Sequence, residues 1–158
     1  MNNTPTAIKS ETQFSVFLAN KPGILARVCQ CLAAEHVNIL AMSMMDATEH
    51  GVLRLVVEDP ENARRAISML DLPVSESAVL ATTLPNRPGA LADVVERLAS
   101  AHVNVNYAYC TTGAAGGKTL GIFRVSDLAK AHRVLAERKL KRRENMAAVR
   151  GNGRLRRK

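Results

Sequence analysis

The stretch NKPGILA at residues 20–26 returns as NRPGALA at residues 86–92, sixty-six residues further along the chain. The similarity extends past both turns, because eleven of the twenty positions in 20–39 are identical in 86–105. Self-similarity at a fixed spacing indicates two copies of one small supersecondary unit. The 158-residue chain is therefore predicted to hold two modules of about 65 to 70 residues. They are expected to share sheet or core, because a module that small is marginal alone.

Each copy predicts the order strand-helix-strand-strand-helix-strand. In the first copy, Phe14–Ala19 alternates as a strand does, residues 22–35 carry apolar side chains at helical spacing, and Pro60 opens a second helix. The second copy follows the same order, and its last helix begins near Asp127, a natural N-cap. This order is the ferredoxin-like arrangement. The predicted fold class is α+β: two βαββαβ modules, each an antiparallel sheet with its helices on one face.

These elements predict the division of the chain. We expect a flexible N-terminus over 1–13, a first module over 14–79, a second over 80–136 and a tail over 137–158. The fourth strand of the second module is uncertain, because its register falls within 137–150, which is charged and poor in β-formers. That strand could be missing, displaced or replaced by a longer final helix. The open face of each sheet must meet a partner or water.

The net charge of +8 lies entirely in the tail. Residues 1–136 carry twelve Lys/Arg and twelve Asp/Glu, whereas residues 137–158 carry ten and two. Clustered cations on a mobile segment bind nucleic acid or other polyanions with strong salt dependence, although a solvated, disordered extension is the simpler interpretation. Polyanion binding through the tail is therefore the alternative function, with the candidate residues Lys139, Lys141, Arg142, Arg143, Arg154, Arg156, Arg157 and Lys158.

Several function classes are disfavoured. The chain has no apolar run long enough to span a bilayer, and its polar start lacks the apolar segment of a signal peptide. We therefore expect no membrane insertion and a cytoplasmic location. The three cysteines show no disulfide or metal-binding spacing, and no nucleophile, base and orienting group form a recognisable set. We expect no enzyme activity, no catalytic residues, no metal and no cofactor.

The repeated turn and its flanking elements resemble a known family. A strand ending in Asn-x-Pro-Gly, then a helix and a second strand opening with Val-Asn, resembles the ACT domain, and the tandem is similar to small stand-alone ACT pairs. The resemblance covers residues 14–136 and occurs twice. ACT domains are regulatory modules that pair side by side, and many bind an amino acid at the junction of two copies. The resemblance implies a non-catalytic protein that senses a small amino acid, as a homodimer or with a partner enzyme.

The strand-to-helix turns suit that role. Glycine lets a ligand approach the backbone, the first helical turn offers free N–H groups to a carboxylate, and an asparagine side chain both donates and accepts. By the resemblance, Asn38 and Asn104 face the other module's turn and complete the site with Asn86 and Asn20 respectively. The candidate ligand-binding residues are Asn20, Lys21, Pro22, Gly23, Ile24, Asn38, Asn86, Arg87, Pro88, Gly89, Ala90 and Asn104. The same turns also serve as ordinary helix entries, and Tyr107 and Tyr109 could line a specificity pocket or belong to the sheet face.

Overall fold

The computed structural model describes residues 8–45, 50–114 and 118–136. Its strands are β1 (Ile8–Ala19), β2 (Ile39–Met45), β3 (His50–Val57), β4 (Val74–Pro85), β5 (Val105–Ala114) and β6 (Lys118–Val125). Its helices are α1 (Ile24–Ala34), α2 (Pro60–Ser68) and α3 (Ala90–Ser100), and residues 128–136 are also helical. The predicted α+β class with antiparallel strands is confirmed. The two expected helix starts are confirmed as well: Pro60 opens α2, and the Asp127 side chain accepts a hydrogen bond from the Lys130 amide at 2.9 Å.

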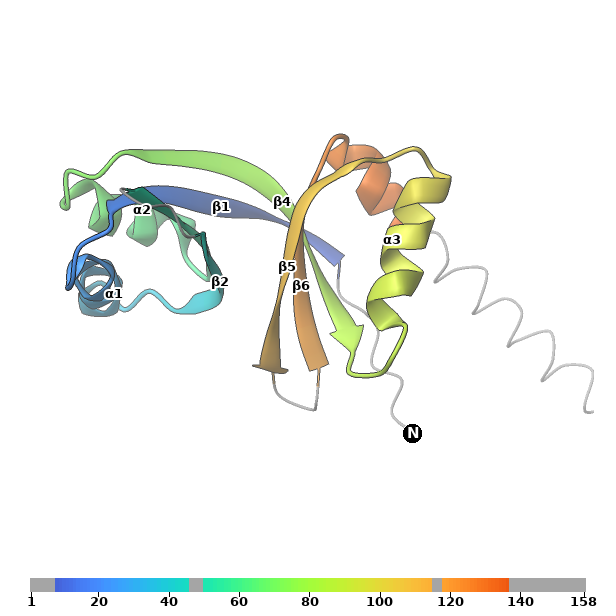
Figure 1. The fold of residues 1–158 in the computed structure, drawn as a ribbon, viewed down its shortest axis with the longest axis horizontal. Coiled ribbons are helices and arrows are strands. Elements are labelled where there is room, and N and C mark those ends of the chain that lie inside the picture. Colours follow the sequence, from blue (N-terminus) through green and yellow to red (C-terminus); the bar gives the residue numbers. More distant parts are fainter. Residues whose placement is uncertain (1–7, 46–49, 115–117, 137–158) are drawn as a thin grey trace, which may run out of the picture.

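The strands form one sheet in the order β2-β3-β1-β4-β6-β5. Its centre is the antiparallel pair of β1 and β4, twelve residues each, which run side by side through both halves of the molecule (Figure 1). The ladder between them extends from Ile8 opposite Thr82 to Val16 opposite Val74. On its other side, β1 pairs with β3, and β4 pairs with β6. Both central strands therefore belong to both halves.

The second half obtains its fourth strand from the start of the chain. Strands β4, β1, β3 and β2 complete the first ferredoxin-like unit, and β4, β6 and β5 give three strands of the second. Beside the Leu80–Thr82 segment of β4, the place of the missing strand is taken by Ile8–Ser10 of β1. Residues 137–150, where we expected that strand, lie outside the described residues.

The prediction of a flexible N-terminus through residue 13 was wrong for residues 8–13, which are the first half of β1. Most of these side chains are polar, so the segment lacks the apolar alternation by which a strand is recognised. Apart from Ile8, which packs against the second core, and the buried Gln13, the segment is held by backbone pairing with β4. A sequence pattern does not report such a partner.

The internal repeat is visible as a pseudo-twofold relation between the central strands. Adding 66 to the bounds of β1, residues 8 and 19, gives 74 and 85, the bounds of β4. The pair Thr12–Ala78, which also differs by 66, lies in the ladder, so the axis passes through it. The turns that follow β1 and β4 therefore lie at opposite ends of the molecule, where α1 and α3 begin (Figure 1).

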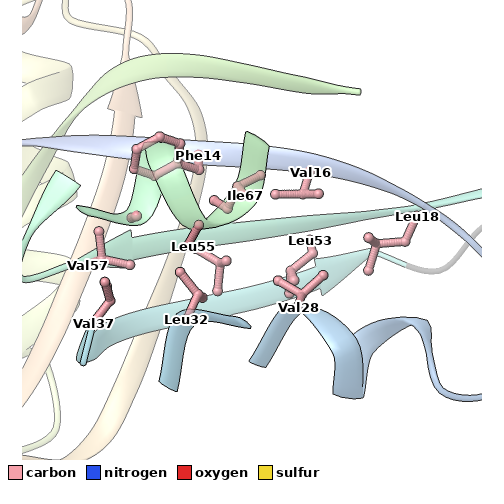
Figure 2. Close-up of a cluster of buried hydrophobic side chains, with 12 residues drawn as sticks. Phe14, Val16, Leu18, Val28, Leu32, Val37, Leu53, Leu55, Val57 and Ile67 are labelled. Carbon is pink, nitrogen blue, oxygen red and sulfur yellow. The ribbon is translucent and has the colours of Figure 1, made fainter. Parts of the chain in front are cut away.

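Two apolar cores lie under the helices, one in each half. In the first, Phe14, Val16 and Leu18 of β1 pack against Val28 and Leu32 of α1 and against α2 (Figure 2). In the second, Leu80 and Leu84 of β4 pack against Val94 and Leu98 of α3. Each fully buried Leu or Phe contributes about 1.5–3 kcal/mol. The even-numbered residues of β1 and β4 thus face the helices.

The open faces of the two halves meet each other. A third cluster joins Ala41 of β2, Val56 of β3, Val79 of β4 and Ile122 of β6, and the edge strands β2 and β5 approach one another. The curl of the sheet thus covers part of the face that the helices leave open.

A polar network lies in the same junction. The fully buried Gln13 donates to the Tyr107 hydroxyl at 2.6 Å and accepts from the Tyr109 hydroxyl at 3.0 Å. The Arg54 guanidinium stacks on the Tyr107 ring, 4.3 Å from its centroid. These tyrosines therefore join β5 to β1 and β3. Buried polar groups that are fully satisfied favour one arrangement of the parts that they connect.

We predict that removing residues 1–12 destabilises the protein by about 3 kcal/mol, because several ladder hydrogen bonds worth roughly 0.5–1.5 kcal/mol each are lost. For a chain of this size the melting temperature should fall by roughly 6–12 °C. The control removes residues 1–7 only and keeps all of β1. Calorimetry of both truncations tests the shared strand, and equal melting temperatures would contradict it.

We predict that Tyr109→Phe lowers stability near pH 8 by about 1–2 kcal/mol, because the buried Gln13 carbonyl loses its donor. Burial, with a smaller contribution from Tyr107, raises the pKa of the Tyr109 hydroxyl above its ordinary value of 10.0. An acidic group whose pKa is higher in the folded than in the unfolded protein contributes its full stabilisation at pH values below its unfolded-state pKa. The contribution of Tyr109 is therefore lost as the pH rises above 10. Tyr109→Phe should therefore show a shallower alkaline decline than wild type.

The control is Ser15→Ala, which removes another hydroxyl bonded to Gln13, at 3.3 Å, but one that does not titrate in this range. Urea unfolding at pH 8 and pH 11 measures all three proteins. Parallel alkaline declines in wild type and Tyr109→Phe would show that burial of this hydroxyl does not matter.

Candidate functional site

The first candidate site is the turn between β1 and α1. Immediately after the last residue of β1, the Lys21 amide donates to the Ala19 carbonyl at 2.8 Å and the Ile24 amide to the Lys21 carbonyl at 3.4 Å. Gly23 closes the turn with φ of 87° and is the N-cap of α1. This left-handed conformation strongly favours glycine, which explains why the repeat retains it.

The start of α1 is open to an anion. No side chain caps it, and the first helical hydrogen bond joins the Arg27 amide to the Gly23 carbonyl at 3.0 Å. The Ile24 amide already donates to Lys21, but the amides of Leu25 and Ala26 also precede that bond and point out of the helix, at the positive end of its dipole. Nothing lies within 4 Å of the position that a Cβ on Gly23 would take. A small ligand therefore has room beside this backbone.

The charge around the first turn is positive. Lys21 and Arg27 are exposed, the first turn of α1 contains no acidic residue, and neither cation forms an ion pair within the described part of the chain. This environment attracts a carboxylate. The Asn20 side chain next to it offers both a donor and an acceptor.

The second turn, between β4 and α3, repeats the same backbone. The Arg87 amide donates to the Pro85 carbonyl at 2.9 Å, the Ala90 amide to the Arg87 carbonyl at 3.3 Å, and the Asp93 amide to the Gly89 carbonyl at 2.9 Å. Gly89 has φ of 82°, and α3 also lacks a side-chain cap. The two copies therefore have nearly the same main-chain geometry.

Their side chains differ. Arg87 Nη2 lies 2.5 Å from Asp93 Oδ2, and Arg87 Nη1 donates to the Pro88 carbonyl at 3.0 Å. The same Nη1 lies 3.6 Å from where a Cβ on Gly89 would be. The Arg87 guanidinium, in a half-exposed ion pair, thus lies beside the second turn, whereas no such neighbour lies beside Gly23. Arg27 and Asp93 are not among the residues predicted from the sequence, although their opposite charges stand at equivalent positions of the two copies.

Asn38 and Asn104 lie far from both turns. Asn38 precedes β2, donates from its side chain to Glu58 Oε2 at 3.3 Å, and accepts on its backbone from the Glu58 amide at 3.0 Å. Asn104 precedes β5. Its carbonyl accepts from the Ser126 amide at 2.9 Å, as the Asn38 carbonyl does from Glu58, but its second bond is from its own backbone amide to the Ser126 hydroxyl at 3.0 Å. By strand register, both lie near the level of the pseudo-twofold axis at Thr12 and Ala78.

The register separates the predicted partners. Asn20 lies eight residues beyond Thr12 along the chain, and Asn86 lies eight residues beyond Ala78 in the opposite direction. Each is therefore about 26 Å from the axis, at 3.3 Å per strand residue. A single chain therefore brings together neither Asn20 with Asn104 nor Asn86 with Asn38. The candidate residues Asn20 to Ile24 do lie together in the first turn, and Asn86 to Ala90 lie together in the second.

Metal sites and membrane spans are absent from the described residues. Within 8–45, 50–114 and 118–136, no three His, Cys, Asp or Glu side chains are close enough to hold a metal ion. No helix of the described chain is both long and apolar enough to cross a membrane. The eight candidate polyanion-binding residues all fall in 137–158, outside the described part.

Comparison with known proteins gives the following matches. A sequence model described as "ACT domain pair" matches residues 9–149. The crystal structure of protein BT0572 from Bacteroides thetaiotaomicron has 32% identity and a TM-score of 0.77, covering 84% of this chain and 90% of that one. The ligand-free regulatory subunit of aspartate kinase from Thermus thermophilus has 16% identity and a TM-score of 0.65, with 85% and 96% covered. The corresponding subunit from Thermus flavus has 15% identity and a TM-score of 0.58, with the same shares covered. No curated protein matches.

Proposed function

Because this chain belongs to the ACT domain pair family, we propose that it is a non-catalytic regulatory protein that binds a small amino acid at the turn between β1 and α1. The observation that carries this proposal is the open space beside Gly23, next to an uncapped helix start and two cations that form no ion pair with any described residue. The ligand's carboxylate accepts from the first-turn amides and is attracted by Lys21 and Arg27. Its ammonium group is held by the Asn20 side-chain oxygen.

Ligand occupancy acts by selecting one arrangement of the protein over another. The bound turn lies at the end of β1, and the same strand carries Gln13, whose side chain bonds to β5 of the other half. A displacement of β1 at the turn therefore reaches the contact between the halves. The Thermus aspartate kinase regulatory subunits are folded alike and are regulatory chains by description. We propose a similar task here, exerted on a partner enzyme or on the protein's own oligomer.

A second copy of the chain completes the site. Strand β2 is an edge of the sheet, contains no charged residue, and exposes Met42, Met44 and Met45. Antiparallel pairing of two β2 strands about Met42 places the second copy's Asn38 just beyond Met45, because 38 and 46 are equally far from 42. Met45 pairs with Val52, and Val52 pairs with Phe17, three residues before Asn20. In such a homodimer, the second copy thus supplies Asn38 to the turn between β1 and α1, a residue that a single chain cannot bring there.

We predict that at least one of the twenty standard amino acids stabilises the protein. A ligand at 100 times its Kd adds about 2.7 kcal/mol, which raises the melting temperature by roughly 5–10 °C. Asn20→Ala should remove most of this increase. The matched control is Asn106→Ala, an exposed asparagine on β5, which should keep it. A thermal-shift screen in which no amino acid stabilises the wild type would refute the proposed function.

We predict a dimer that depends on the β2 edge. Light scattering should give twice the chain mass of 17.1 kDa for wild type. Met44→Lys should give the single-chain mass, because pairing would bury the new charge. Met69 is more exposed than Met44 and lies just after α2, so Met69→Lys should remain dimeric. A monomeric wild type at saturating ligand would contradict the shared site.

A further inference from the structure

We propose that the open sheet face of the first half binds an organic carboxylate with an apolar body, and that Arg54 of β3 holds the carboxylate group. Arg54 lies between Ser15 of β1 and Ser43 of β2 in the strand register. These three residues form the Arg54 row, and an exposed apolar row lies next to it on the same face. The site is distinct from the turn between β1 and α1, and it does not depend on the proposed function.

The Arg54 guanidinium is partly buried, yet it donates no hydrogen bond to any described residue and forms no ion pair with one. Arg97 and Arg124 are the other partly buried arginines of the described chain, and each donates to a backbone carbonyl. Arg54 instead contacts the Tyr107 ring, 4.3 Å from its centroid. A ring contact satisfies none of the five N–H donors of a guanidinium. Because a partly desolvated cation without acceptors costs free energy, this position favours an anionic ligand.

The fold does not require an arginine at this position. Its equivalent in the second half is Ile122 of β6, because Ser15 pairs with Arg54 and Ala81, 66 residues after Ser15, pairs with Ile122. Ile122 is fully buried in the apolar cluster between the halves. An apolar residue therefore suits this position of the sheet, and the charge in the first half is better explained by an anion than by packing.

Two hydroxyl groups lie where they can bind the same carboxylate. Ser15 and Ser43 are direct cross-strand neighbours of Arg54, and the Cβ atoms of such neighbours are about 4.5–5.5 Å apart. Ser15 Oγ accepts from Gln13 Nε2 at 3.3 Å and donates to no described residue, so its own hydrogen is available. Both serines are partly exposed. One carboxylate can therefore accept from the guanidinium and from a hydroxyl together.

The adjoining row of the same face is apolar and exposed. Phe17, Val52 and Met45 pair across β1, β3 and β2, two residues or about 7 Å from the Arg54 row. Phe17 is 41% exposed and Met45 is 50% exposed. The second half has Thr83 at the position of Phe17, 66 residues later, so the fold does not require a large apolar side chain there. An open aromatic ring beside a cation suits a ligand that is anionic at one end and apolar at the other.

This face does not suit the ammonium group of an amino acid. No acidic residue of β1, β2 or β3 lies in the Arg54 row or in the rows on either side of it, which consist of Phe17, Val52 and Met45 and of Gln13, Val56 and Ala41. An ammonium group would therefore meet Arg54 with no counter-charge nearby. The ligand expected here is a carboxylate without an amine, which distinguishes it from the ligand proposed for the turn.

Amide NMR of the ¹⁵N-labelled full chain tests this inference, with acetate, butanoate, hexanoate and octanoate as probes. The Ser15 and Ser43 signals report on the face, and the Gly23 signal reports on the turn. In wild type, hexanoate should shift Ser15 and Ser43 and leave Gly23 unchanged. Each methylene group that the apolar row covers should strengthen binding roughly two- to fourfold. Hexylamine, which has the same body and the opposite charge, should leave Ser15 and Ser43 unchanged.

Arg54→Ile introduces the residue that the second half has at this position, so the variant should fold. It should weaken hexanoate binding about ten- to hundredfold, the usual contribution of hydrogen bonds to a charged group. If it does not fold, Arg54→Gln removes the charge, keeps a polar side chain and should weaken binding as well. The matched control is Arg65→Ile, which removes an exposed arginine of α2 and should bind hexanoate as wild type does. Phe17→Thr should bind acetate normally but lose the gain with chain length.

The outcomes separate this inference from the proposed function. Equal hexanoate binding by wild type and the Arg54 variants overturns the inference, and so does a wild type in which no carboxylate shifts Ser15 and Ser43. Both results leave the proposed function standing as long as an amino acid shifts Gly23. A hexanoate response that is lost in the Arg54 variants, together with no response of Gly23 to any amino acid, supports the inference and refutes the proposed function.

Discussion

The antiparallel pairing of β1 with β4 is the constraint on which the rest of this structure depends. Each strand serves the core of one half and the sheet of the other, so neither half is complete without the other. The pairing also fixes the positions of the functional elements. Because the strands run in opposite directions from a common axis, their two turns lie at opposite ends, and the residues that begin β2 and β5 lie near the middle. The distance between the predicted partners follows from this register.

Much of the fold could be predicted from the sequence because the sequence contains two copies of the same unit. The repeated turn, the helices behind it and the strand order are local features, and hydrophobic periodicity reports them. Ile8–Gln13 escaped prediction for a physical reason: a largely polar segment becomes a strand only because β4 offers it an unpaired edge. The identity of the second half's fourth strand is a property of the assembled sheet. No periodicity within residues 137–150 could have revealed that Ile8–Ser10 fill that place.

The candidate site was predictable in part. Its glycines are required by a left-handed backbone that the repeat retains, and its ACT character, inferred from the turn motif, is confirmed by the family match. The pairing of asparagines across modules was inferred for any two adjacent ACT copies, and the register of this chain does not bring them together. The two turns differ at Arg27 and Asp93, which periodicity treats alike as exposed positions on a helix. The ion pair of Asp93 with Arg87 becomes visible only in the structure.

A crystal structure of the full chain grown with the amino acid that stabilises it most would test the central claim directly. The account predicts the ligand's carboxylate within hydrogen-bond distance of the first-turn amides of α1, beside Gly23, with the Arg87–Asp93 pair intact at the other end of the molecule. A ligand found elsewhere, such as between the open faces near Tyr107, with the turn after β1 empty, would contradict it.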